Sequence, residues 1–187
     1  MGGYNLVNVN ASAMDLGLRY FFGGDIAPTL YAEYGYGSGD GDRVKNVTSS
    51  KEGSTAGDDK AYRAFGGLPM GNALAPGLAN IKIYKWGGSF KPFGRSPNDF
   101  WSDMTWQGAY YSYSTAVKGG ATSDNPLQVG AAAKSQKIGN EMDLNVSWKI
   151  LSDASYQLKL GQFKPGAAYG PSRAKQNYIK MKWTFDL

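Results

Sequence analysis

The sequence predicts an all-β fold, an antiparallel transmembrane β-barrel of which this chain supplies about seven strands. Residues 141–150 alternate polar and apolar side chains without an exception, and four further segments repeat that alternation. No run of about 18 apolar residues exists, which excludes a transmembrane helix. Strands of roughly 10 residues, by contrast, are long enough to cross a hydrocarbon layer of about 25 Å.

The segment 141–150 shows the pattern most clearly. On a strand, successive side chains point to opposite faces, whereas on a helix these apolar residues would step by about 200° and scatter around the axis. One face of this strand is therefore apolar and the other polar. The apolar side chains are Met142, Leu144, Val146, Trp148 and Ile150, and the polar ones are Glu141, Asp143, Asn145, Ser147 and Lys149.

The same alternation occupies residues 14–22, 29–36, 156–161 and 178–187. Each segment is weak evidence alone, but five together distinguish a membrane barrel from one strand of a soluble sheet. Aromatic residues near strand ends suit the interfacial girdles of a barrel, and stacking on sugars is the alternative use. The girdle candidates are Tyr20, Phe22, Tyr34, Tyr36, Trp148, Trp183 and Phe185.

The strand pattern and the turn residues together give strand boundaries. Near Tyr84 the apolar register switches, which predicts either a β-bulge or a strand buried on both sides. The predicted strands are residues 4–22, 28–37, 79–91, 103–114, 139–151, 154–164 and 175–187.

The connections between these strands alternate between short and long. Barrels of this kind have short periplasmic turns and long outer loops, so we expect residues 38–78 and 115–138 to be extracellular. An open sheet in lipid leaves unpaired backbone groups along each edge, at a total cost of tens of kcal/mol. We therefore expect residues 1–187 to be a single domain, either the C-terminal part of a larger barrel or one that other chains complete. No secretory signal opens the chain, so its start is interpreted as mature or truncated.

Composition removes most enzyme chemistry. The chain has no cysteine and no histidine, which excludes thiol nucleophiles and histidine bases and leaves no basis for a bound metal or other cofactor. We expect no catalytic activity. The net charge of +5 is spread along the chain, which argues against nucleic-acid binding and for a lumen that favours anions. Residues 37–42 are weighed as a calcium loop, but a strand-to-loop exit is the preferred interpretation.

Lumen-facing side chains are the only candidate binding residues. An anion that passes between such cations makes contacts weak enough to release. The alternative is that mixed charges only brace a wet interior, pairing across strands for about 0.2–1 kcal/mol each. The candidates are Arg19, Lys149, Lys159, Lys180, Lys182, Glu33, Glu141 and Asp143, with Tyr31 and Tyr111 as sugar-contact candidates.

Four motifs carry a family resemblance, and they appear in this order: Tyr34-Gly35-Tyr36-Gly37-Ser38-Gly39-Asp40-Gly41-Asp42, Tyr62-Arg63, Ile138-Gly139-Asn140-Glu141-Met142-Asp143-Leu144 and Gly161-Gln162-Phe163-Lys164-Pro165-Gly166. With a final aromatic strand, they make residues 11–187 similar to the C-terminal half of the alginate-export outer-membrane porins. The resemblance implies a barrel of about eighteen strands that passes an acidic polysaccharide through a positively lined pore. It also implies a Gram-negative outer membrane, with lipids and the barrel-assembly machinery as partners.

Three functions stay open at this stage. The first is a porin-like channel that passes an anionic solute, such as the polysaccharide alginate, by passive diffusion. The second is a non-conducting structural or interaction barrel whose long loops recognise a partner. The third is a soluble β-sandwich that binds polysaccharide.

Overall fold

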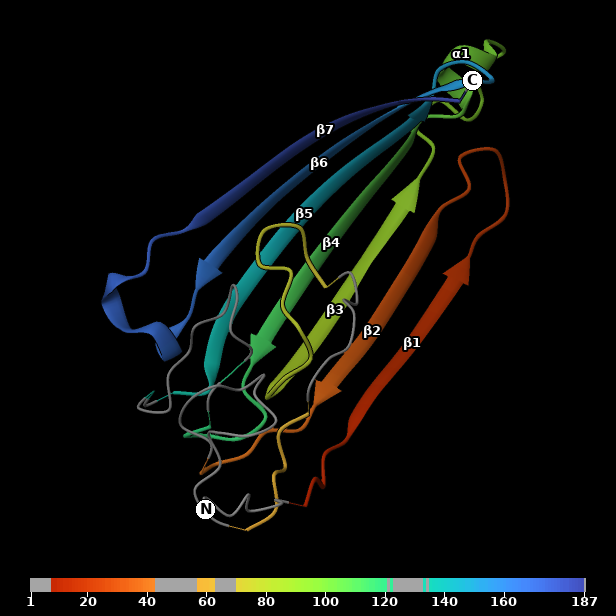
Figure 1. The fold of residues 1–187 in the computed structure, drawn as a ribbon. Coiled ribbons are helices and arrows are strands. Elements are labelled where there is room, and N and C mark those ends of the chain that lie inside the picture. The colour runs from red at the N-terminus through yellow and green to blue at the C-terminus, as the bar shows by residue number, and fades with distance from the viewer. Residues whose placement is uncertain are drawn as a thin grey trace.

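The computed structural model describes residues 8–42, 57–62, 70–120, 122, 133 and 135–186. They form one antiparallel sheet of seven strands, in which each strand lies beside its neighbours in the sequence (Figure 1). The all-β prediction is confirmed. Within the described residues, neither helical segment is long and apolar enough to span a membrane.

The seven predicted strands are all present, most with boundaries within a few residues. The connections also contain a short helix, α1 (Asp99–Ser102), and a 3₁₀ segment, η1 (Ala167–Ser172). The strands are β1 (Ala13–Phe21), β2 (Thr29–Gly37), β3 (Ile81–Phe90), β4 (Thr105–Ser114), β5 (Lys137–Lys149), β6 (Ala154–Pro165) and β7 (Gln176–Phe185).

The first strand begins later than predicted. Ser12 exchanges backbone and side-chain hydrogen bonds with Ser38, and Val9 forms an isolated bridge with Asp59 in the long connection. The chain at residues 8–12 therefore pairs with a loop instead of extending β1. Residues 4–7, the start of the predicted strand, lie outside the described residues.

The strand register carries the predicted alternation across the sheet. One row of directly opposed residues runs from β3 to β7 through Phe90, Trp106, Val146, Leu158 and Met181, and all five are apolar. Because opposed residues share a face, the apolar positions of the seven strands form one continuous surface. We call it the apolar face, and the opposite side the polar face.

Aromatic side chains line the apolar face at the end where the short connections lie. The indole N–H of Trp148 donates to the carbonyl of Phe100 over 2.6 Å, and Trp101 stacks on Trp148 at 4.9 Å. Helix α1 is thereby held against β5. Trp183 and Phe185 stack on β7 at the same end, so aromatic rings border the apolar surface there.

The sheet is open. Within the described residues, β1 pairs only with β2 and β7 only with β6. A closed cylinder is therefore not formed by these seven strands. The unpaired edges of β1 and β7 each present a row of backbone N–H and C=O groups to further strands.

The connections alternate in length as predicted, and the two kinds lie at opposite ends of the sheet (Figure 1). Residues 22–28, 91–104 and 150–153 join strands at the end where α1 lies. Residues 38–80, 115–136 and 166–175 join them at the other end, which we call the long-loop end.

Both predictions for the register switch at Tyr84 are wrong. The pairing of β3 is continuous on both sides, and Tyr84 is half exposed on the apolar face. Ile81 and Ile83 are fully buried on the polar face, because residues 70–80 cover them. The register irregularity lies instead between Tyr113 and Ser114 of β4.

The hydrophobic core lies between that covering segment and the long-loop half of the polar face. The segment contributes Met70, Leu74 and Leu78, and the sheet contributes most of the bulk, so this half of the face is packed rather than open. The buried sheet residues of the core are Tyr31, Ile81, Ile83, Ala109, Tyr111, Tyr113, Ile138 and Phe163.

Candidate functional site

The polar face carries the candidate site, and a piece of the β2–β3 connection crosses it. Residues 70–76, which we call the strap, turn back from the long-loop end and lie over the sheet (Figure 1, yellow). They belong to the predicted loop 38–78. The strap divides the polar face into a covered half and an uncovered half that extends toward the short connections.

Two carboxylates of β5 hold the backbone of the strap. Glu141 accepts hydrogen bonds from the N–H groups of Ala73 at 2.7 Å and Leu74 at 2.9 Å. Asp143 accepts one from the N–H of Asn72 at 2.9 Å. Carboxyl oxygens are acceptors and backbone N–H groups are donors, so the two side chains and the strap backbone are complementary. Three successive amides are therefore fixed to two side chains that stand two residues apart on one strand.

Further hydrogen bonds fix the two ends of the same stretch. The hydroxyl of Tyr113 donates to the carbonyl of Met70 at 2.8 Å. The side-chain amide of Asn72 donates to Asn145 Oδ1 at 2.8 Å and to the carbonyl of Leu160 at 3.0 Å. The strap thus contacts β4, β5 and β6.

Glycines make room for the strap. At Gly161 an added Cβ would lie 2.8 Å from Asp143 Oδ1 and 3.1 Å from the backbone nitrogen of Ala73. At Gly71, where φ is +113°, an added Cβ would lie 2.7 Å from Glu141 Oε1. Side chains at these two positions would push the strap off the sheet, and at Gly71 they would also strain the backbone.

On the polar face of β1–β4, outside the strap, the side chains of Lys85 and Arg19 lie over tyrosine rings. Lys85 forms an ion pair with Glu33 at 2.9 Å, and its ammonium lies 5.3 Å from the ring centre of Tyr31 and 5.8 Å from that of Tyr111. Arg19 lies 5.5 Å from the ring centre of Tyr31 on the other side. Both tyrosines are less than a tenth exposed. The cations cover them, so sugar contact there would have to begin with Arg19 or Lys85.

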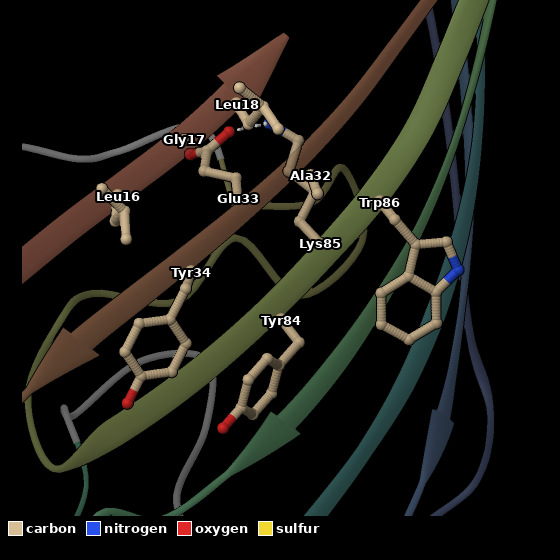
Figure 2. Close-up of a pocket in the computed structure, with 9 residues that line it drawn as sticks. All are labelled: Leu16, Gly17, Leu18, Ala32, Glu33, Tyr34, Tyr84, Lys85 and Trp86. Carbon is tan, nitrogen blue, oxygen red and sulfur yellow. Dashed lines mark hydrogen bonds and ion pairs between the residues drawn. The ribbon is translucent and has the colours of Figure 1, made fainter.

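Figure 2 shows the other side of the same strands. A hollow of about 430 Å³ on the apolar face has small residues, Gly17 and Ala32, at its base. Leu16, Leu18 and Trp86 stand around it in the close-up. The dashed line marks the ion pair between Glu33 and Lys85, whose register positions belong to the polar face.

The lysines of β5–β7 face the polar side without acidic partners. Lys159 and Lys180 are directly opposed, and Lys182 is opposed to Gln157. Among the residues that the structure describes, none of these lysines forms an ion pair, and neither does Lys149. Directly opposed like charges repel each other. This corner of the polar face therefore has an unbalanced positive charge that an anion would relieve.

All ten predicted site residues lie on the polar face, but they form three groups instead of one. Arg19, Tyr31, Glu33 and Tyr111 surround Lys85, whereas the four lysines lie on β5–β7. Glu141 is fully buried and Asp143 is 6 % exposed beneath the strap. We therefore assign these two to holding the strap rather than to contact with a solute.

The sequence reasoning missed Lys85 and Asn72. The position of Lys85 follows from the β3 alternation once Ile81 and Ile83 are assigned to the polar face. Nothing periodic marks the strap, so Asn72 carried no signal. In the segment considered as a calcium loop, the Asp40 carboxylate accepts hydrogen bonds from the backbone N–H groups of Asp42 and Lys60. These bonds hold residue 60 of the long connection beside the end of β2. Within the described residues, no group of acidic side chains is arranged to hold a metal ion.

Comparison with known families decides the assignment. A family model described as alginate export matches residues 4–180. The chain belongs to the alginate-export family. A comparison with curated proteins finds no match. Family membership links this sheet to the export or transport of alginate, an acidic polysaccharide, and the predicted resemblance is confirmed.

Within this alginate-export family chain, the matched residues include both the strap and the four-lysine corner of the polar face. The two features lie side by side. The amide of Asn72 bonds to Asn145, which is directly opposed to Lys159. The end of the strap and the first pair of lysines are therefore neighbours on the same face.

Proposed function

We propose that this chain forms part of an outer-membrane β-barrel through which an acidic polysaccharide, alginate or a related anion, passes by passive diffusion. The observation that carries the proposal is the division of the sheet into an apolar face and a polar face with unpaired lysines. A lipid-facing exterior and a charged interior are the two surfaces that such a channel needs.

The apolar face supports the membrane part of the proposal. Leu18, Leu144, Ile179 and Met181 lie on it, and Leu18, Ile179 and Met181 are each about two-thirds exposed or more. Exposed apolar surface of this extent is unfavourable in water and favourable in lipid. The open edges of β1 and β7 favour a larger closed barrel, because unpaired backbone groups are costly within a bilayer. Lipids and the barrel-assembly machinery are then its partners, in the outer membrane of a Gram-negative cell.

The polar face supports passage of an anion without catalysis. Lysine ammonium groups are compact, hydrated charges on flexible stems, so contacts with passing carboxylates form and break readily. Neither a nucleophile with an adjacent base nor a cofactor is needed for diffusion. We propose that the protein is not an enzyme and that it does not bind nucleic acid.

Neutralising the opposed lysines should weaken anion preference. In the variant Lys159→Gln/Lys180→Gln, we expect the anion-to-cation permeability ratio to fall about fivefold. Two charges about 8 Å from a passing ion, screened by about 0.1 M salt, shift the energy of an anion and of a cation by about 0.5 kcal/mol each in opposite directions. Reversal potentials measured in planar bilayers under a salt gradient provide this ratio.

A matched control removes the same charge from the opposite face. Lys82 and Lys164 lie on the apolar side of β3 and β6 near the long-loop end, and Lys82→Gln/Lys164→Gln should leave the ratio unchanged. Equal effects of both pairs would contradict the proposed lumen. A wild-type protein that inserts but does not conduct would favour the interaction barrel, and one that stays soluble without detergent would favour the soluble polysaccharide binder.

A further inference from the structure

We propose that the strap, residues 70–76, is a fixed constriction of the conducting path, and that Glu141 and Asp143 are the positioning residues that hold it there. This inference rests on the proposed function, since a constriction has meaning only in a channel. It assigns to two buried carboxylates a role distinct from contact with the solute.

The hydrogen bonds show that the carboxylates hold the strap by its backbone. Glu141 binds the amides of Ala73 and Leu74, and Asp143 binds the amide of Asn72, all between 2.7 and 2.9 Å. Backbone amides are present whatever the side chains, so the carboxylates fix the path of the chain itself. Beneath the strap, both carboxyl groups are also out of contact with a passing polyanion.

The position of the strap indicates where the path is narrowed. The side chain of Asn72 reaches Asn145 of β5 and the carbonyl of Leu160 of β6. Asn145 is directly opposed to Lys159, which is opposed to Lys180. A chain of sugars that passes the end of the strap must therefore pass these two lysines at close range.

Packing makes the strap a fixed element rather than a mobile lid. Met70, Leu74 and Pro76 are almost completely buried, and Met70 and Leu74 belong to the core that covers the sheet. Opening the strap would expose these side chains and break the hydrogen bonds between both carboxylates and the strap backbone. Burial of aliphatic side chains of this size is strongly favourable, so spontaneous opening is rare.

Amide substitution of the two carboxylates should release the strap. Glutamine and asparagine keep the size but present N–H groups to the strap amides and lose the charge. In Glu141→Gln/Asp143→Asn we expect about a twofold rise in single-channel conductance with anion preference retained, because the lysines remain while the path widens. Asp15→Asn controls for the loss of a polar-face carboxylate as such, since Asp15 is opposed to Gly35 of β2 rather than to β4–β6, and the rise in the strap variant should exceed any change in Asp15→Asn.

A disulfide can lock the strap again, because the chain has no cysteine of its own. An added Cβ at Gly161 would lie 3.0 Å from the Cβ of Asn72, and disulfides need about 3.8 Å, a shift of less than an ångström. We call Glu141→Gln/Asp143→Asn the release variant. When it also carries Asn72→Cys/Gly161→Cys, oxidation should restore wild-type conductance and reduction should raise it again. That reversal excludes misfolding as the cause of the rise.

The outcomes separate this inference from the proposed function. A wild-type protein without anion-selective conductance would overturn both. The wild-type channel could instead conduct anions while the release variant keeps the same conductance, or while the disulfide has no effect on that conductance. Either result would overturn only the assignment of the strap as a constriction. Conductance that rises on release and falls on oxidation is the expected result.

Discussion

Leu144→Lys on the apolar face of β5 should destabilise the protein in a bilayer, lowering its free energy of unfolding by about 2–4 kcal/mol. Leu144 lies opposite Gly108 and Leu160, near the middle of the apolar face. In the proposed barrel, a lysine there is surrounded by hydrocarbon and cannot reach water at either end of the strand. Equilibrium unfolding in urea from lipid vesicles, followed by tryptophan fluorescence, measures the change.

Ser147→Lys on the same strand provides the comparison. Ser147 is exposed on the polar face, opposite Thr105 and Gln157. An added lysine there remains in water, and repulsion from Lys149 on the same strand should be limited to about 1 kcal/mol or less. Equal losses for the two variants, or a smaller loss for Leu144→Lys, would mean that the apolar face does not contact lipid.

Gly161→Val on β6 should have the second largest effect, because it places a side chain where the strap lies. Valine suits a β-strand, so the strand itself tolerates the change. Its Cβ, however, would lie 2.8 Å from Asp143 Oδ1 and 3.0 Å from the Cβ of Asn72. Overpacking of this kind costs about 1–3 kcal/mol. Urea unfolding measures that loss, and faster protease cleavage within residues 70–76 indicates that the strap has lifted.

Gly108→Val is the matched control for crowding. Gly108 also lies within a strand, and no atom lies within 4 Å of an added Cβ there. Its position on the apolar face should make valine neutral or slightly stabilising. If Gly161→Val behaves like Gly108→Val in both measurements, the strap does not rest on β6.

Strand pattern was predictable because it depends on local chemistry alone. In residues 141–149 of β5, polar and apolar side chains alternate without exception, and the register places every one of them on the predicted side. Lys159 and Lys180 were likewise assigned to the polar face from neighbouring residues only. Period-two alternation survives folding wherever one face meets water and the other an apolar medium.

The strap could not be predicted, because its position depends on contacts between residues distant in sequence. Asn72 meets Asp143 across 71 positions and Leu160 across 88. Its glycine and small residues are typical of an exposed loop, which is how the sequence was interpreted. The burial of Ile81 and Ile83 follows from the same covering segment, and this is why the apolar residues of β3 change face at Tyr84.

Glu141 and Asp143 show the limit of assigning function by face. Their alternation places both on the polar side, which is right, yet it carries no information about what covers them. Only the hydrogen bonds to residues 72–74 distinguish a carboxylate that meets solute from one that holds backbone.

Labelling of single cysteines on β5 tests most directly whether the apolar face meets lipid and the polar face meets water. The chain has no cysteine, so Leu144→Cys, Val146→Cys, Ser147→Cys and Lys149→Cys each create one reporter. In protein reconstituted in vesicles, a lipid-soluble maleimide should label positions 144 and 146, and a membrane-impermeant, water-soluble one should label 147 and 149. Labelling of positions 144 and 146 by the water-soluble reagent, and of 147 and 149 by the lipid-soluble one, would contradict the assignment of the two faces.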